Sequence, residues 1–331
     1  MKMPPQKAVQ KVIDSAYSFG MPTPGSRFTN PDRLSSTTLR LVTEAWERGI
    51  PSAVTKLAQR GRLPPQSQPL HFMDITTAEI PLVVDHWKLE TPTGPLMASR
   101  VILTAGGSSY PKTGTTGDAY TWLTALGHTV LPLRPSLVPW TVSLPWVRDL
   151  AGLTLEDARV TLDFADKPSQ RGGFLFTHQG VSGPAPMNLS RLLPREKRGP
   201  CRLLLDPFPD LDGKVLLEAI RAWRLPLPSR LAVVLKPEGN PAQWTKDQLQ
   251  ATARRLKAIP LQPAEPMGYD KAEVTQGGVL LAEVDPKTMA SRIAPGLFVA
   301  GELLDLDGPI GGYNLAAAWA TGWAAGKAAA S

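Results

Sequence analysis

The chain has 331 residues, too many for one ordinary domain, so two or three structural units are expected. Hydrophobic residues make up 42% of the chain and charged residues 20%, values that exclude a wholly disordered protein. The net charge is +7, and the basic residues lie in short patches, Arg191–Arg202 and Arg254–Lys257, that solvated helix faces explain. No nucleic-acid partner is therefore expected.

Cysteine usage and hydropathy indicate a cytoplasmic location. Cys201 is the single cysteine, cannot form an intrachain disulfide, and lies in an apolar stretch where cysteines are usually packing residues. The four histidines are scattered, so no metal site is expected. Residues 1–21 contain no apolar core of a signal peptide, and Leu315–Ala330 is too short and too weakly apolar to span a bilayer. No membrane association is expected.

The first third of the chain changes from a helical to a strand-like sequence pattern. Residues 1–60 predict mainly helix. Residues 71–104 hold short apolar runs around a turn at Thr93–Pro95, which predicts a small antiparallel meander. Its last run, Val101–Thr104, is almost wholly apolar, as in a strand buried on both faces. Thr116 is the expected N-cap of a helix over residues 117–126.

The remaining chain alternates β-rich and helical segments. Residues 136–210 hold strand-like runs between glycine and proline turns, which predict a small barrel or sheet insert. Residues 211–260 return to helix, and residues 272–283 and 296–300 are strand-like before a last helix over Tyr313–Ala330. The spacing of Gly322 and Gly326 in that helix predicts close packing on a neighbouring element.

The C-terminal region holds the most informative candidate site. The apolar strand Leu297–Ala300 ends in Gly301 and Glu302, and a carboxylate in that position can accept hydrogen bonds from sugar-like hydroxyls. The segment Gly311–Asn314 then opens the last helix, where free N–H groups and the positive end of the helix dipole are available. This combination suits the ribityl chain and the electron-rich edge of a flavin. An ordinary strand–turn–helix connection is the alternative reading.

Two further features could carry chemistry. Ala105, Gly106 and Gly107 follow Val101–Thr104 at a strand end, where open α/β sheets bind ligands. His178, in a glycine-rich turn, is either a proton donor near substrate or a structural histidine that caps the turn, and the second reading is favoured. The sequence assigns no catalytic residue and contains no recognisable Ser-His-Asp set.

Four blocks occur in an order that resembles a known bacterial family: Thr104–Asp118, Phe176–Pro184, Ala272–Val279 and Gly296–Gly326. An earlier block, Ser26–Ser35, is similar to the same family. The chain thus resembles the FAD-dependent oxidoreductases called aminoacetone-oxidase-like or BaiN/RdsA-like flavoproteins. The resemblance implies an α/β fold with an FAD/NAD(P)-binding Rossmann-like domain and inserted β-barrel and helical subdomains.

The resemblance also implies cofactor contacts and domain boundaries. The candidate FAD-binding residues are Ala105, Gly106, Gly107, Gly301, Glu302, Gly311, Gly312, Tyr313 and Asn314, and NAD(P)H is a possible second cofactor. The flavin-binding domain is expected in two parts, residues 1–135 and 265–331. A β-barrel-like insert over 136–210 and a helical insert over 211–264 are expected between them. The implied reaction is hydride transfer between flavin and a nicotinamide or small organic substrate.

One family feature is missing from the sequence. Family members begin with a strand followed by Gly-x-Gly-x-x-Gly, and Gly20–Gly25 has the wrong spacing for that motif. The first βαβ unit is thus expected to be absent and the protein truncated, with binding of FAD by this chain alone doubtful. The alternative function is a flavin-free remnant that acts as a binding or assembly module. An exposed sheet edge would then associate with a partner chain or a second copy.

Overall fold

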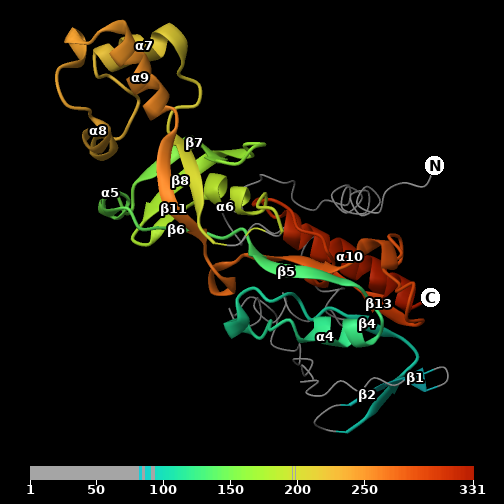
Figure 1. Ribbon diagram of the computed structural model, residues 1–331. Helices are drawn as coiled ribbons and strands as arrows, with labels where there is room; N and C mark the ends of the chain where they lie inside the picture. Colours follow the sequence, from blue (N-terminus) through green and yellow to red (C-terminus); the bar gives the residue numbers. More distant parts are fainter. Residues whose placement is uncertain (1–81, 84–85, 91–93, 196, 198) are drawn as a thin grey trace, which may run out of the picture. The chain divides into compact units, whose positions relative to one another are not determined.

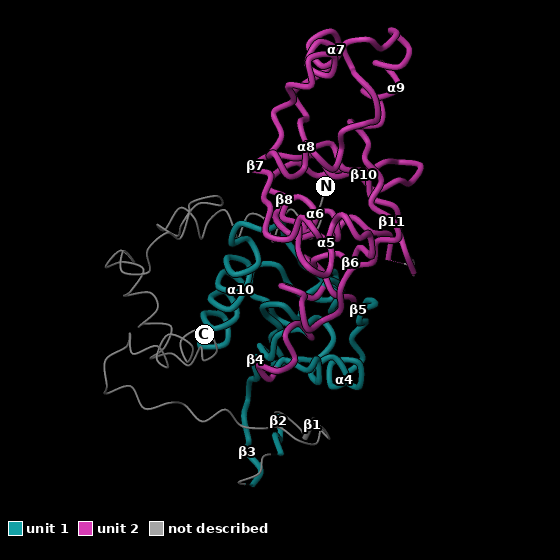
Figure 2. The backbone as a smooth tube through the Cα atoms, turned by 90° about the vertical axis from the view of Figure 1, so that its left-hand side faces the viewer, with its two compact units in different colours: residues 1–107, 115–133, 276–331 teal, residues 108–114, 134–275 magenta. Residues whose placement is uncertain are grey.

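The computed structural model describes residues 82–83, 86–90, 94–195, 197 and 199–331 (Figure 1). These residues belong to two compact units, coloured separately in Figure 2. Unit 1 comprises the described parts of residues 1–107, with 115–133 and 276–331, and unit 2 comprises 108–114 and 134–275. The predicted helices over residues 1–60 and the Ser26–Ser35 block lie outside the described residues.

Unit 1 begins with the predicted meander. Strands β1 (Leu82–Val83), β2 (His86–Leu89) and β3 (Leu96–Ala98) form a three-stranded antiparallel sheet in chain order. Trp87 lies opposite Ala98 in this sheet, and its side chain is buried in the core of unit 1. An antiparallel meander is therefore present among the described residues up to Ala98, but the last predicted run, Val101–Thr104, is not part of it, because residues 101–103 pair with another strand in a separate sheet.

A short parallel sheet follows, made of β4 (Val101–Leu103) and β13 (Leu297–Val299). The two strands pair directly with each other, Leu297 lying opposite Val101 and Val299 opposite Leu103. Val101 and Leu103 are buried, but the side chain of Ile102 is 38% exposed. The predicted burial of this strand on both faces is therefore wrong for its central residue.

Helices α4 (Asp118–Ala125) and α10 (Tyr313–Ala329) complete unit 1. They share one core with the parallel sheet, to which α4 contributes Tyr120 and Leu123 and α10 contributes Ala325. The N-cap of α4 is Gly117 in the left-handed conformation, whereas the hydroxyl of Thr116 donates to the carboxylate of Asp118 at 2.7 Å. The prediction of Thr116 as the cap is thus wrong by one residue.

Strands β5 (Val130–Ser136) and β12 (Val274–Val279) form a two-stranded sheet. Gly277 and Gly278 in β12 both have positive φ angles, +94° and +126°. A Cβ added to Gly278 would lie 2.5 Å from the carbonyl oxygen of Leu303, and one added to Gly277 would overlap the carbonyl oxygen of Pro132. The glycine pair therefore permits a close backbone approach that any side chain would prevent.

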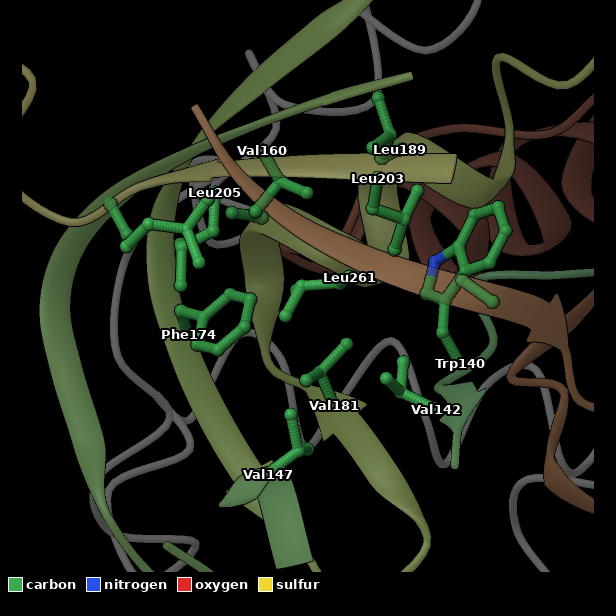
Figure 3. Packing of buried hydrophobic residues seen from close by; sticks show 14 of the residues in the cluster. Trp140, Val142, Val147, Val160, Phe174, Val181, Leu189, Leu203, Leu205 and Leu261 are labelled. Atoms are coloured by element: carbon green, nitrogen blue, oxygen red, sulfur yellow. The ribbon is translucent and has the colours of Figure 1, made fainter. Parts of the chain in front are cut away.

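Unit 2 is built on a closed barrel with the strand order β10-β11-β6-β9-β8-β7. Its strands are β6 (Trp140–Val142), β7 (Thr154–Leu162), β8 (Ser169–Thr177), β9 (Gly180–Ser182), β10 (Cys201–Asp206) and β11 (Ile259–Pro266). Alternate side chains point inward and fill the interior with buried apolar residues, among them Phe174, Leu203 and Leu261 (Figure 3). Cys201 is one of these buried residues, as predicted. The barrel reaches beyond residues 136–210, because β11 follows the helical insert.

Short helices and turns complete unit 2 around the barrel. Helix α5 (Pro145–Asp149) lies between β6 and β7 in the chain, and α6 (Pro184–Ser190) lies between β9 and β10. Trp140 donates its indole N–H to the carbonyl of Pro186, which joins β6 to α6 across the core. Two 3-10 turns, η2 (Pro111–Thr113) and η4 (Tyr269–Lys271), meet where Tyr110 donates its N–H to the carbonyl of Tyr269.

The helical insert contains α7 (Gly213–Arg221), α8 (Ser229–Leu235), η3 (Pro241–Gln243) and α9 (Lys246–Leu256). Leu216 and Ile220 of α7 pack on Leu249 and Leu256 of α9 in a small separate core. Thr245 and Gln248 form a capping box at the start of α9. Lys257 joins this insert to the barrel, because its ammonium lies 2.7 Å from the carboxylate of Asp206.

Candidate functional site

Two parallel strands in unit 1 end at the same sheet edge. Val299 of β13 lies opposite Leu103 of β4, and the N–H of Ala300 donates to the carbonyl of Leu103 at 3.1 Å. The chain leaves β4 through Ala105, Gly106 and Gly107 and leaves β13 through Gly301 and Glu302. The structure thus brings together the two glycine-containing segments that the sequence analysis placed at separate strand ends.

Gly106 requires its glycine for conformational and steric reasons. Its φ angle is +80°, and an added Cβ would lie 3.0 Å from a methyl carbon of Thr115. Gly107, the next residue, is buried, whereas Ala105 is exposed. The chain therefore turns at Gly106 without a side chain. The backbone there stays uncovered, which a ligand that approaches the strand end would need.

Gly301 begins the 3-10 turn η6 (Gly301–Leu303), and α10 holds this turn in place. The N–H of Gly301 donates to the Thr321 hydroxyl at 2.9 Å, and that hydroxyl donates in turn to the carbonyl of Ala317 at 2.7 Å. Gly301 has a φ angle of +73°, and an added Cβ would lie 4.0 Å from the Cβ of Ala318. The turn at the end of β13 is therefore fixed against the second and third turns of α10.

Glu302 is half-buried and sits at the centre of η6. Its carbonyl accepts a hydrogen bond of 2.9 Å from the buried Tyr120 hydroxyl of α4. Thr321 and Tyr120 thus hold η6 from two different helices. Neither residue was singled out from the sequence. The one available signal was Thr321, a polar residue within an otherwise alanine-rich apolar helix.

The N-terminus of α10 presents exposed backbone. Gly311 and Gly312 are exposed with φ angles of +129° and +90°, and no side chain caps the helix. The first intrahelical bond runs from Ala316 to Gly312, so the N–H groups of Tyr313, Asn314 and Leu315 have no hydrogen-bond partner among the described residues. Such N–H groups, with the helix dipole behind them, favour a partly negative ligand atom.

The Asn314 side chain holds the loop before α10 closed. Its carbonyl oxygen accepts from the N–H of Gly308 at 2.7 Å, and its amide nitrogen donates to the carbonyl of Gly308 at 2.9 Å. Both polar ends of the side chain are therefore engaged within the protein. Asn314 thus fixes the position of Gly311 and Gly312, and its own amide group is not directed toward a ligand.

Other predicted residues have different surroundings. His178 is exposed in the turn between β8 and β9, where the hydroxyl of Thr177 accepts from the N–H of Gly180. The favoured reading of His178 as the residue that caps this turn is therefore wrong. An added Cβ at Gly322 or Gly326 would meet no described atom within 4 Å, so the predicted close packing is not seen in the part of the chain described.

The described residues also limit the kinds of site that are present. They contain no group of three or more His, Cys, Asp or Glu side chains that could hold a metal ion. None of the described helices is both long enough and apolar enough to cross a membrane. The candidate site is made of the strand ends of unit 1 and the α10 N-terminus, where Gly106, Gly301 and Gly312 present backbone in the left-handed conformation.

Comparison with known proteins identifies relatives over most of the chain. The family model described as HI0933-like protein Rossmann domain matches residues 79–328. Ribosomal RNA dihydrouridine synthase of Escherichia coli is 32% identical over 240 residues, which cover 68% of this chain and 59% of the relative. The 3-dehydro-bile acid delta(4,6)-reductase of Clostridium scindens is 32% identical over 261 residues, covering 70% and 62%. The chain therefore spans about three fifths of the length of these relatives.

Proposed function

Because the chain belongs to the HI0933-like family of FAD-binding Rossmann-domain oxidoreductases, we propose that unit 1 forms the flavin end of an FAD site. The reaction proposed is hydride transfer between the flavin and a nicotinamide or small organic substrate, in the cytoplasm. The observation that carries the proposal is the common edge at which β4 and β13 end. Two glycine segments leave the sheet there, and α10 anchors one of them through Thr321.

The residues present fit one end of FAD better than the other. Glycine backbone at Gly106 and Gly301 leaves room for a ligand at the strand ends, and the α10 N-terminus offers N–H donors. These features suit the ribityl chain and the O2/N1 edge of the flavin. The described residues include no Gly-x-Gly-x-x-Gly turn after a strand, which is the usual support of the pyrophosphate. The proposal therefore assigns the flavin end only.

Each proposed protein group has a separate task. Glu302 would accept hydrogen bonds from ribityl hydroxyls, and Tyr120 holds its backbone in position. The N–H groups of Tyr313, Asn314 and Leu315 would stabilise negative charge at the ring edge that they face. Asn314 keeps the Gly308–Gly312 loop in the shape that exposes those groups. The bound flavin itself would supply the hydride chemistry, and the protein would position and polarise it.

The substrate class proposed is a carbon–carbon double bond conjugated to a carbonyl. One relative is named for making dihydrouridine and another for reducing a delta(4,6) 3-dehydro-bile acid. In uracil and in a 3-oxo-4,6-diene steroid, the reducible double bond lies in conjugation with a carbonyl. Such a bond accepts a hydride at the end remote from the carbonyl, which leaves a conjugated enolate, and a proton at its other carbon. The reduction therefore also needs a proton donor, and the proposal assigns none.

Flavin binding tests the proposal directly. The chain should be titrated with FAD while the visible absorption and quenching of flavin fluorescence are followed. Glu302→Ala removes a charge-assisted hydrogen bond and should weaken binding roughly 10- to 150-fold. Glu156→Ala, an exposed barrel substitution, is the matched control and should leave binding unchanged. Equal flavin affinity of wild-type protein and the Glu302→Ala variant would contradict the role proposed for Glu302. A folded protein that binds no FAD would contradict the proposal as a whole.

The proposed substrate class needs a second measurement. In protein that holds flavin, oxidation of NADH or NADPH should be followed with a small conjugated enone and with its saturated ketone. We expect turnover with the enone alone, because the saturated ketone offers no double bond for hydride addition. Equal turnover of both compounds, or of neither, would contradict the substrate class while leaving the flavin assignment intact.

A further inference from the structure

We propose that residues 211–257, the helical part of the insert, form an RNA-binding surface. This segment holds nine Lys and Arg residues against four Asp and Glu residues, a net charge of +5 in a chain whose total is +7. The sequence predicts no nucleic-acid partner because its basic residues lie in short patches along the chain. The structure packs α7 on α9 in one small core of unit 2, so charges that lie apart in the sequence belong to neighbouring helices (Figure 1).

Seven of the nine cations are exposed and form no ion pair among the described residues. The two others are engaged: Lys257 pairs with Asp206, and Arg230 donates to the carbonyls of Asp149 and Ala151. The seven are Lys214, Arg221, Arg224, Lys236, Lys246, Arg254 and Arg255. Their charges remain available to a partner, although the four nearby acidic residues reduce the net field.

Two arginines of the barrel face carboxylate partners. Arg171 on the barrel bonds to both Asp157 and Asp210, and Arg202 lies 3.5 Å from the carboxylate of Asp163. These contacts hold the pKa of the Asp157 and Asp210 carboxyls below the usual range, chiefly through the hydrogen bonds from Arg171. On the barrel, Arg171 and Arg202 thus face carboxylates, whereas the seven exposed cations of the insert have no carboxylate partner among the described residues.

Helix stability does not explain all of these charges. Arg221, Arg254 and Arg255 lie in the last turns of α7 and α9, where a cation complements the helix dipole. Lys214 and Lys246 lie in the first turns, where the dipole disfavours a cation. A role outside the helix is therefore the better account of these two lysines.

The surface suits RNA better than an anionic membrane. Helices that lie on a bilayer insert an apolar face into it, but Leu216 and Ile220 of α7 are buried against Leu249 and Leu256 of α9. The large apolar side chains that the described residues leave exposed on α7 and α8 are three valines, Val215, Val233 and Val234. Four of the seven cations are arginines, whose planar guanidinium group binds phosphate through two parallel hydrogen bonds. The choice of RNA rests in part on the proposed function, since one relative of this chain is named as acting on ribosomal RNA.

Salt-dependent binding tests the proposal in the full chain. A fluorescently labelled RNA stem-loop with a uridine-rich loop should be titrated by anisotropy over a range of salt concentrations. The Arg254→Gln/Arg255→Gln variant removes two phosphate contacts, so the slope of log K against log salt should fall by about 1.4. That change in slope corresponds to roughly 25-fold weaker RNA binding by the variant than by wild type at about 0.1 M salt. Both side chains are exposed, so circular dichroism and the melting temperature should stay unchanged.

A matched control separates this site from general charge. Arg148→Gln/Lys167→Gln removes the same charge from exposed positions on the barrel and should alter binding less than about twofold. The same loss in both variants, or no RNA binding by the wild-type chain at low salt, would overturn the proposal. Binding to vesicles of phosphatidylserine and phosphatidylcholine without binding to RNA would also overturn it.

Flavin absorption measured on the same samples distinguishes this inference from the proposed function. RNA binding by protein that takes up no flavin would support the RNA surface and contradict the flavin site. Flavin uptake and enone reduction without RNA binding would support the flavin site and contradict the RNA surface. The two proposals therefore fail separately, because their readouts are independent.

Discussion

The carboxylate of Glu283 accepts two hydrogen bonds from adjacent residues, His128 and Thr129. Its Oε2 atom lies 3.0 Å from Nδ1 of the buried His128 and 2.8 Å from the N–H of Thr129. On the other side of the imidazole, Nε2 lies 2.8 Å from the Ser291 hydroxyl. This chain of contacts joins the segment after α4 to η5 (Leu281–Glu283) and to the segment before β13 within unit 1.

The stability contributed by Glu283 should depend on pH. Burial alone would raise its pKa, but the hydrogen bonds from Thr129 and His128 outweigh burial and hold the pKa below its usual value. A carboxyl with a lowered folded-state pKa contributes stability above its unfolded value, about 4.3, and loses it as pH falls through the folded value. Glu283→Gln should therefore destabilise the protein by about 1.5–3 kcal/mol at neutral pH and by less in acid.

Urea unfolding of wild type and the Glu283→Gln variant at neutral pH and at about pH 3, well below the usual pKa of a glutamate carboxyl, would measure this difference. Glu238→Gln is the control, because Glu238 is exposed and has no partner among the described residues. That variant should match wild type at both pH values. A Glu283→Gln difference that is as large in acid as at neutral pH would show that the carboxylate charge is unimportant.

The backbone contact at Gly278 gives a second prediction. Alanine there would place its Cβ 2.5 Å from the carbonyl oxygen of Leu303 and would also have to adopt a φ angle of +126°. Gly278→Ala should cost more than about 2 kcal/mol, because backbone on both sides must move. Gly114 has a φ angle of +94° with no atom within 4 Å of an added Cβ, so Gly114→Ala should cost about 1 kcal/mol.

Thermal unfolding of the two variants tests whether the close approach matters beyond backbone strain. Both substitutions impose the strain of a positive φ angle, and only Gly278→Ala also adds a steric overlap. Equal shifts in melting temperature would show that the contact of Gly278 with Leu303 relaxes at little cost.

The sequence predicted element types well where local patterns are strong. Turn residues around Gly94 predicted the antiparallel strands β2 and β3, and helical spacing predicted α10 to within one residue. The barrel was predicted as β-rich, but not its closure through β11 (Ile259–Pro266). That pairing joins segments separated by the whole helical insert, and no local pattern encodes such a long-range contact.

The candidate site was predicted as separate segments. Strand ends and glycines are visible in the sequence, so Gly106 and Gly301 could be chosen from it. Their common sheet edge depends on the register between β4 and β13, which the sequence does not specify. The role of Asn314 was also missed, because its side chain bonds to a residue in a loop without regular structure. The N-cap of α4 is also one residue later than predicted. Gly117 holds that position because a glycine adopts the left-handed conformation that a threonine would avoid.

The Asn314 contact predicts a graded effect on flavin binding. Asn314→Ala removes both bonds to Gly308, so the loop that presents Gly311 and Gly312 should lose its fixed shape. Asn314→Asp keeps the acceptor for the N–H of Gly308 and loses only the donor. If unit 1 holds flavin as proposed, the alanine variant should bind FAD about tenfold more weakly, with the aspartate variant between it and wild type.

Limited proteolysis of the flavin-free protein provides an independent measurement for the same variants. Cleavage between residues 308 and 312 should become faster in Asn314→Ala than in wild type, because a loop without its fixed hydrogen bonds opens more often. Leu315→Ala, at an exposed position one residue further along α10, is the control and should leave the loop intact. An unchanged cleavage rate in Asn314→Ala would show that the loop holds its shape without this side chain.

The outer edge of β4 gives the last prediction. The N–H of Val101 donates to Gly296 and the carbonyl of Leu103 accepts from Ala300, so both groups face β13. Because backbone groups of successive residues in a strand point to opposite sides, the N–H and carbonyl of Ile102 face the other edge. They have no hydrogen-bond partner among the described residues, and the Ile102 side chain is 38% exposed. We propose that this edge pairs with the same edge of a second copy.

Sedimentation velocity over a range of protein concentrations would test the association. Wild-type protein should form dimers or larger species, and Ile102→Lys should shift it toward monomer, because a lysine on a strand edge disfavours pairing with another strand. Met97→Lys is the control: Met97 is an exposed apolar residue, at 57%, on the separate β1–β3 sheet. Loss of association in both variants would indicate a general apolar contact, whereas a monomeric wild type at all concentrations would show that the β4 edge does not pair with a second copy.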